Sequence, residues 1–197
     1  MCGRFWIAPD DAPEALTALI HAAEGQARRH RSDFALKHGE LCPGDEAAVL
    51  ALNRKLEPSV FVMRWGFRMD KRLIFNARSE SAMVKPLFRD SFSQRRCLIP
   101  ASAYFEWDHR GERKTKVMFW PEGEKRTYLC GLYRVEDDPR HPAFAVLTRE
   151  AASAVAAFHD RMPVILPEDA SMQWLQPDTD PLALLRMSIE NLSFRPA

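Results

Sequence analysis

The sequence lacks any run that approaches the roughly 20 consecutive apolar residues of a membrane-spanning helix. Its first residues, MCGRFWIAPDD, lack the basic segment and apolar run of a secretory signal. The cysteines Cys2, Cys42, Cys97 and Cys130 show no CxxC spacing, which argues against a zinc site or a thioredoxin-like motif. We therefore expect a cytoplasmic protein with free thiols, no metal, no cofactor and no membrane contact.

An excess of one charge sign is also lacking. The 28 Lys and Arg residues against 27 Asp and Glu residues give a net charge of +1, so any nucleic-acid binding must come from local clustering. One such stretch is residues 64–68, RWGFR, where basic and aromatic residues alternate as they do on single-strand-binding surfaces. The same alternation is ordinary for an amphipathic strand. The runs RRHR (28–31) and RGERKTK (110–116) are interpreted as solvated loops.

The 197 residues, 46% of them hydrophobic, suffice for one ordinary domain, which we expect to span residues 1–197 as a monomer. A helix is predicted from Asp10 or Asp11 to about Ala23, and another from Ser79 to before Pro86. Three further short helices are predicted in AASAVAAFH, PEDASMQWL and PLALLRM. Strands are predicted in AAVLAL, SVFVMRWGF, RRCLIPASAYFEW, KVMFW, TYLCGLYRV and FAVLT. Because strands and helices do not alternate regularly, the pattern favours an α+β fold with a mixed, mostly antiparallel, partly closed (barrel-like) sheet flanked by short helices.

Cys2 is the first candidate for chemistry. Removal of Met1 would leave a free α-amine, with a pKa of about 7.7–8.0, beside a thiol. A neutral amine can attack an aldehyde to give an imine, and the thiol can then close a five-membered thiazolidine ring. This chemistry is available only to an N-terminal cysteine. The alternative is that Cys2 is simply a small apolar residue of an N-terminal strand.

Other candidates lie farther along the chain. Asn76 and Arg78, in NARSE, offer amide hydrogen bonds and a two-donor grip on phosphate, although a turn with Ser79 capping a helix would also explain them. Glu106, in AYFEWD, would share one strand face with Tyr104, where desolvation would suit it to acid catalysis; a solvent-facing edge strand is the alternative. His159 could instead be a helix C-terminal residue favoured by the helix dipole.

Together these segments resemble the SOS-response-associated peptidase (SRAP) family of abasic-site processing proteins. The matching segments, in family order and over nearly the whole chain, are MCGRF, CPGDEAAVL, RWGF, NARSE, RCLIPASAYFEW, AVLTREA and HDRMPVIL. The resemblance implies binding of single-stranded DNA that contains abasic sites, and covalent cross-linking to the site through Cys2 as a thiazolidine. The peptidase name refers to removal of the residues that precede the cysteine, and a lyase activity is a further possibility.

The resemblance also assigns roles residue by residue. It makes Cys2 the nucleophile, Asn76 a group that orients the amine or the sugar, Glu106 an acid–base catalyst and His159 an aid to proton transfer. It makes Arg4, Arg78 and Arg161 ligands of DNA phosphates, and it places Trp65 and Thr148 in DNA-facing segments. Such a protein would associate with the nucleoid through DNA.

The chain departs from the family pattern after RWGF, where the usual Pro and second Trp are missing and the segment is shorter. Two other functions remain open. An N-terminal Cys-Gly also begins the N-terminal-nucleophile glutaminases, although those sequences usually read MCGI and Arg4 stands here. A non-catalytic single-strand-binding module is the second, and it leaves the combination of Cys2, Glu106 and His159 unexplained.

Overall fold

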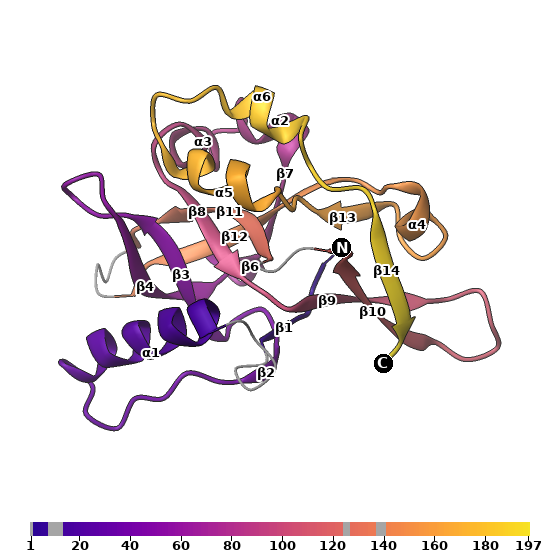
Figure 1. Ribbon diagram of the computed structural model, residues 1–197, viewed down its shortest axis with the longest axis horizontal. Helices are drawn as coiled ribbons and strands as arrows, with labels where there is room; N and C mark the ends of the chain where they lie inside the picture. The colour runs from indigo at the N-terminus through magenta and orange to yellow at the C-terminus, as the bar shows by residue number, and fades with distance from the viewer. Residues whose placement is uncertain (1, 8–13, 124–126, 137–140) are drawn as a thin grey trace.

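A ring of five strands forms the centre of the protein in the computed structural model, which describes residues 2–7, 14–123, 127–136 and 141–197 (Figure 1). The ring runs in the order β11 (Tyr128–Arg134), β8 (Arg96–Pro100), β3 (Glu46–Leu52), β4 (Pro58–Trp65) and β12 (Ala143–Glu150), and it closes because β12 also pairs with β11. The pairs are antiparallel except β4 with β12. The predicted α+β fold with a partly closed sheet is confirmed.

A second antiparallel sheet carries the amino terminus. Its order is β14 (Leu192–Pro196), β10 (Thr115–Pro121), β9 (Ala103–Asp108), β1 (Phe5–Ile7) and β2 (Gly39–Leu41). The chain passes from the ring into this sheet directly after β8, so the predicted strand RRCLIPASAYFEW is two strands in two sheets. Two short strands extend the ring at β12, namely β7 (Asn76–Arg78), parallel to it, and β13 (Arg161–Pro163), antiparallel to it.

Between β4 and β7 the chain forms a hairpin of β5 (Phe67–Met69) and β6 (Arg72–Ile74). Gly66 makes the turn out of the ring with a φ of 112°, and a Cβ there would lie 2.4 Å from the Leu73 side chain. Only glycine meets both conditions without strain. This hairpin is formed by the segment in which the sequence departs from the family pattern.

Short helices cover the sheets. They are α1 (Glu14–Arg28), against β3 and β4, α2 (Ser79–Ala82), α3 (Arg89–Gln94), α4 (Ser153–Ala156), α5 (Glu168–Leu175), against β8 and β11, and α6 (Pro181–Leu185). The predicted start of the first helix, at Asp10 or Asp11, lies outside the described residues. The segment AASAVAAFH forms only the four-residue α4, while α3 and β14 were not predicted.

Trp65 corrects one prediction about DNA contact. Its side chain is fully buried, its indole N–H donates to the carbonyl of Phe75 at 2.9 Å, and its ring is parallel to that of Phe144 at a centroid distance of 6.2 Å. A ring with no exposed face cannot stack on a base. The basic and aromatic residues of RWGFR therefore belong to two strands, β4 and β5, whose aromatic side chains are both buried.

Candidate active site

Cys2 lies three residues before the start of β1, and its carbonyl oxygen and its thiol both have partners. The amide of Asn76, on β7, donates to the carbonyl oxygen of Cys2 at 2.9 Å, and the backbone N–H of Phe105, on β9, donates to the carbonyl of Arg4 at 2.9 Å. The Cys2 thiol lies 3.7 Å from that same carbonyl and is fully buried. Burial, and then the charge of Glu106, raises the pKa of the thiol, which therefore stays protonated at neutral pH.

Glu106 lies on the buried face of β9 with Tyr104, as the alternation of the strand predicted. β9 lies between β1 and β10, so the alternative of an edge-strand glutamate facing solvent is wrong. Burial raises the pKa of Glu106 to about 7, which allows it to exchange a proton near neutral pH. Burial also raises the pKa of Tyr104, with smaller contributions from Cys2 and Glu106, so all three groups share one environment.

Tyr104 was not among the predicted site residues. Its hydroxyl is buried and has no hydrogen-bond partner among the described residues. Its position opposite Phe5 in the β1–β9 pair, two residues before Glu106, was the available signal.

His159 follows α4, and its neighbour Phe158 connects it to the site through aromatic packing. The neighbouring Phe158 ring lies 5.3 Å from Phe119, which in turn lies 5.3 Å from Tyr104. The Nδ1 atom of His159 accepts from the backbone N–H of Arg161 at 2.9 Å and lies 2.7 Å from a carboxylate oxygen of Asp160. The first contact suits the neutral ring with its proton on Nε2; the second becomes an ion pair once the ring gains a proton.

Because burial lowers the pKa of His159, the neutral ring is favoured at neutral pH. In that state Nε2–H is a proton donor. Protonation of the ring would turn its contact with the Asp160 carboxylate into an ion pair. This carboxylate also raises the pKa of Glu106. The turn at residues 159–160 is thus coupled electrostatically to Glu106.

The three arginines assigned to phosphate binding differ in their surroundings. Arg78 is exposed on β7, beside Thr148 of β12. Arg4 donates to Glu40 at 2.8 Å and to the Cys42 sulfur at 2.7 Å, and its side chain remains 39% exposed. These two can meet an anion directly.

Arg161 is already occupied. Its two terminal nitrogens each lie 2.8 Å from an oxygen of Glu80, and one also donates to the carbonyl of Thr148 at 2.7 Å. Thr148 itself is buried, so the structure places this residue beneath the arginine and not on a DNA-facing surface, a second correction. Sequence reasoning also missed Glu80, which lies within NARSE and holds Arg161 in place.

The arrangement combines a buried thiol at the second residue, a carboxyl group with a near-neutral pKa and an imidazole whose proton is on Nε2. Such a set can move protons during addition to a carbonyl group. Among the described residues, no group of three or more His, Cys, Asp or Glu side chains is arranged to hold a metal ion. No helix in the described part of the chain is long and apolar enough to cross a membrane.

Comparison with known proteins defines the family. The sequence model described as "SOS response associated peptidase (SRAP)" matches residues 1–196, and this chain belongs to that family. The abasic site processing protein YoqW of Bacillus subtilis is 33% identical, over 92% of this chain and 83% of its own. The abasic site processing protein YedK of Escherichia coli is 26% identical, over 89% of this chain and 80% of its own.

The fold has solved counterparts. A protein from Bacteroides thetaiotaomicron superposes with a TM-score of 0.77 over 99% of this chain and 91% of its own, at 20% identity. A protein from Bordetella bronchiseptica gives 0.74 at 20% identity, over 100% of this chain and 99% of its own. At such identities these structures show a shared fold.

Proposed function

We propose that this protein, once Met1 has been removed, binds single-stranded DNA and cross-links to abasic sites through Cys2, shielding the lesion during the DNA damage response. One observation carries the proposal: the second residue is fixed by Asn76 in a buried site beside Glu106. Membership of the family and the names of its relatives support the same substrate.

The proposed reaction proceeds in two steps. The Cys2 amine attacks the aldehyde carbon of the ring-opened abasic sugar, and the resulting carbinolamine loses water to form an imine. The thiol then adds to the imine carbon while its proton passes to the nitrogen, which gives a thiazolidine and releases one water overall. Glu106 would protonate the departing hydroxyl and accept the thiol proton, and His159 would pass protons to the sugar oxygen.

The same groups would serve the removal of residues ahead of Cys2. Hydrolysis of the peptide bond before Cys2 adds water to the carbonyl carbon of the preceding residue and delivers a proton to the departing nitrogen, and Glu106 is a buried acid close enough for its charge to raise the pKa of the Cys2 thiol. We include this autopeptidase activity, and a lyase activity at the abasic site, in the proposal. A denaturing gel tests the core of it: abasic single-stranded DNA should give a heat- and detergent-resistant band shift, and the same strand without the lesion should give none.

Glu106→Gln is expected to slow cross-linking by roughly 100-fold, the scale of lost general acid catalysis. The fold should persist, because burial already favours the neutral carboxyl group that the amide imitates. Since the reaction needs a protonated Glu106 (pKa about 7) and a neutral amine (pKa about 7.7–8.0), the wild-type rate should peak between these values and fall at higher pH. The variant should lose the falling limb.

The matched control is Glu112→Gln, which makes the same change on the exposed β9–β10 connection. Single-turnover rates across pH 5–10, read from gels, provide the comparison. A Glu106→Gln variant that reacts at the wild-type rate would assign the acid role to another group.

Reversible DNA binding is expected to weaken as salt rises. Because Arg161 is paired with Glu80, the phosphate contacts expected here come from Arg4 and Arg78, and they would contribute about −1.4 to the slope of log affinity against log salt, by the single-strand rule of roughly −0.7 per contact. Fluorescence anisotropy with lesion-free DNA measures the slope without interference from the covalent step. A flat response would remove these arginines from the phosphate role.

A further inference from the structure

A second cluster of arginines lies at the other end of β12 from the candidate active site. In the strand register Arg64 is opposite Ala143, whereas Arg78 is opposite Thr148. Five residues of strand separate Arg64 from Arg78, or roughly 17 Å at about 3.4 Å per residue, and three residues, or roughly 10 Å, separate Arg64 from Asn76, which holds Cys2 and is opposite Val146. The cluster is therefore a separate place on the surface, and the chemistry proposed for Cys2 does not use it.

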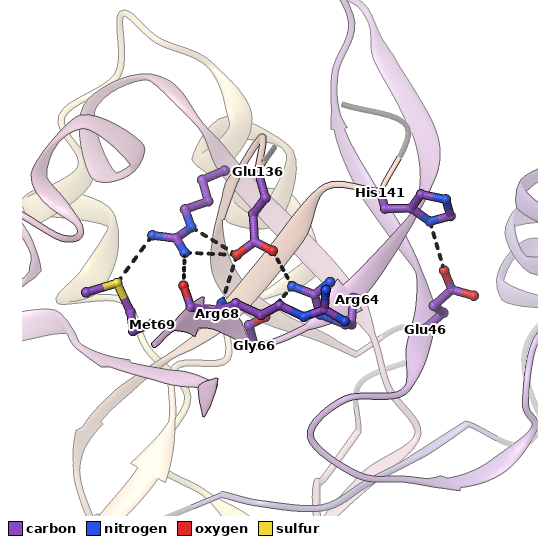
Figure 2. Close-up of polar contacts among 8 residues, drawn as sticks. Glu46, Arg64, Gly66, Arg68, Met69, Glu136 and His141 are labelled. Atoms are coloured by element: carbon purple, nitrogen blue, oxygen red, sulfur yellow. Dashed lines mark hydrogen bonds and ion pairs between the residues drawn. The ribbon is translucent and has the colours of Figure 1, made fainter. Parts of the chain in front are cut away.

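A hollow of about 1000 Å³ opens at this end of the ring, lined by Gly44, Asp45, Glu46, Arg64, Arg68, Arg134, Val135, Glu136 and His141. Its floor is an ionic network. Glu136 forms an ion pair with Arg64 through one carboxylate oxygen and accepts from Arg134 at 2.9 Å and from the backbone N–H of Arg68 at 2.8 Å through the other (Figure 2). One carboxylate thus serves two guanidinium groups.

The positive charges of Arg64, Arg68 and Arg134 exceed the single negative charge of Glu136 in this network. The Arg68 side chain is exposed, has no ion-pair or hydrogen-bond partner among the described residues, and extends toward Arg64 (Figure 2). Arg64 is mostly buried, and its Nε atom has no hydrogen-bond partner in the described part of the chain. Like charges that face one another repel, and an anion bound between them would relieve that repulsion. A network that only joined the strands would not require the side chain of Arg68.

The other acids at the rim do not neutralise this excess. Asp45 is paired with Lys37 at 2.6 Å, and Glu46 receives two bonds from Arg31 at 2.9 and 3.0 Å. The charge of the described lining therefore resides mainly in Arg68 and the arginines beside Glu136.

A neighbouring hollow of about 480 Å³ shares Glu46 and His141 with the first and continues toward the end of α1. Its lining includes Arg29, His30 and Arg31 of the RRHR motif, which the candidate active site leaves unused. Basic side chains thus continue from the first hollow to the residues that follow α1. Such a row suits several successive phosphates and not a single ion.

We propose that the hollow between Arg64, Arg68 and Arg134 binds a phosphate of the single strand whose lesion is held at Cys2, with Arg68 as its direct ligand. Arg134 would hold Arg68 by donating to its carbonyl at 2.6 Å, and the Arg64 guanidinium, paired with Glu136, would add positive charge beside it. The choice of a polynucleotide over a free anion rests on the proposed function.

The test uses a lesion-free single strand of about 20 nucleotides and fluorescence anisotropy over a range of salt. Arg68→Gln is expected to weaken binding by roughly two- to fivefold, the scale of one exposed ion pair, and to reduce the magnitude of the salt slope by about 0.7. Arg54→Gln is the matched control, because Arg54 is an exposed arginine on the turn at the opposite end of β4. The Arg54→Gln control should leave both the affinity and the salt slope unchanged.

Equal affinity and slope for the Arg68→Gln variant, the Arg54→Gln control and the wild type would overturn the proposal. Titration with inorganic phosphate, followed by calorimetry, separates the two sources of the anion. Phosphate binding that is lost in Arg68→Gln without any change in DNA binding would overturn the polynucleotide assignment. An absent cross-link in every variant, together with the expected Arg68 effect on binding, would remove the proposed function at Cys2 and leave this site standing.

Discussion

A Cys2→Ala variant is expected to give no covalent product with abasic DNA while it keeps most of its reversible affinity. Affinity should come from the exposed arginines, whereas a stable adduct needs a thiol beside a correctly placed amine. Because Asn76 binds the carbonyl oxygen of Cys2 and not its sulfur, the substitution leaves the anchoring of the terminus intact. Denaturing gels and anisotropy on the same preparation separate the two effects.

Cys130→Ala is the matched control for loss of a buried thiol. Cys130 is as fully buried as Cys2, and burial likewise raises its pKa, but it lies within β11 and has no terminal amine. This variant should cross-link normally. Cys2→Ser adds a sharper test, since it retains the amine and should give an imine trapped by borohydride but no stable adduct. A heat-stable Cys2→Ser product made without reductant would exclude the thiazolidine.

Retention of Met1, or of any N-terminal tag, is expected to abolish stable cross-linking completely. The Cys2 nitrogen is then an amide whose lone pair is delocalised into a carbonyl group, so it cannot form an imine. The thiol alone would give a hemithioacetal, which reverses readily. Active protein should therefore have the mass of the chain without Met1.

Intact-mass spectrometry and the cross-linking gel should be run on the same sample. A tagged protein with a protease site directly before Cys2 provides the control, because cleavage should restore activity without any change in sequence from Cys2 onward. A population that retains Met1, cross-links fully and carries the adduct on Cys2 would refute the mechanism.

The central strands of the fold were predictable because they are short, continuous, largely apolar runs. All of β8 is buried, as are the inner residues of β3, and the runs RCLIP and AAVLAL show this directly. The helix predicted in AASAVAAFH was longer than the four-residue α4, because alanine content indicates helix propensity and not where packing ends a helix. The polar strand β14 gave no comparable signal, since it is formed by pairing with β10.

The features of the site that lie within a single strand were predictable from the sequence. Period-two alternation placed Glu106 and Tyr104 on one face, and the structure confirms that arrangement. The contact between Asn76 and Cys2 joins residues 74 positions apart and depends on β7 pairing with β12 while β1 pairs with β9. No local pattern records such a register. Trp65 was misplaced because alternating polarity describes both a stacking surface and a half-buried strand.

The anchoring of Cys2 has a consequence for how the protein would be used. Under the proposed function the reactive group is the protein's own terminus, held by Asn76 and by the β1–β9 pairing, and it leaves the free pool when it reacts. The protein would then behave as a stoichiometric reagent, one molecule for each lesion, for as long as the adduct lasts. The capacity of a cell to protect abasic sites would be set by the number of copies it makes and not by a turnover number.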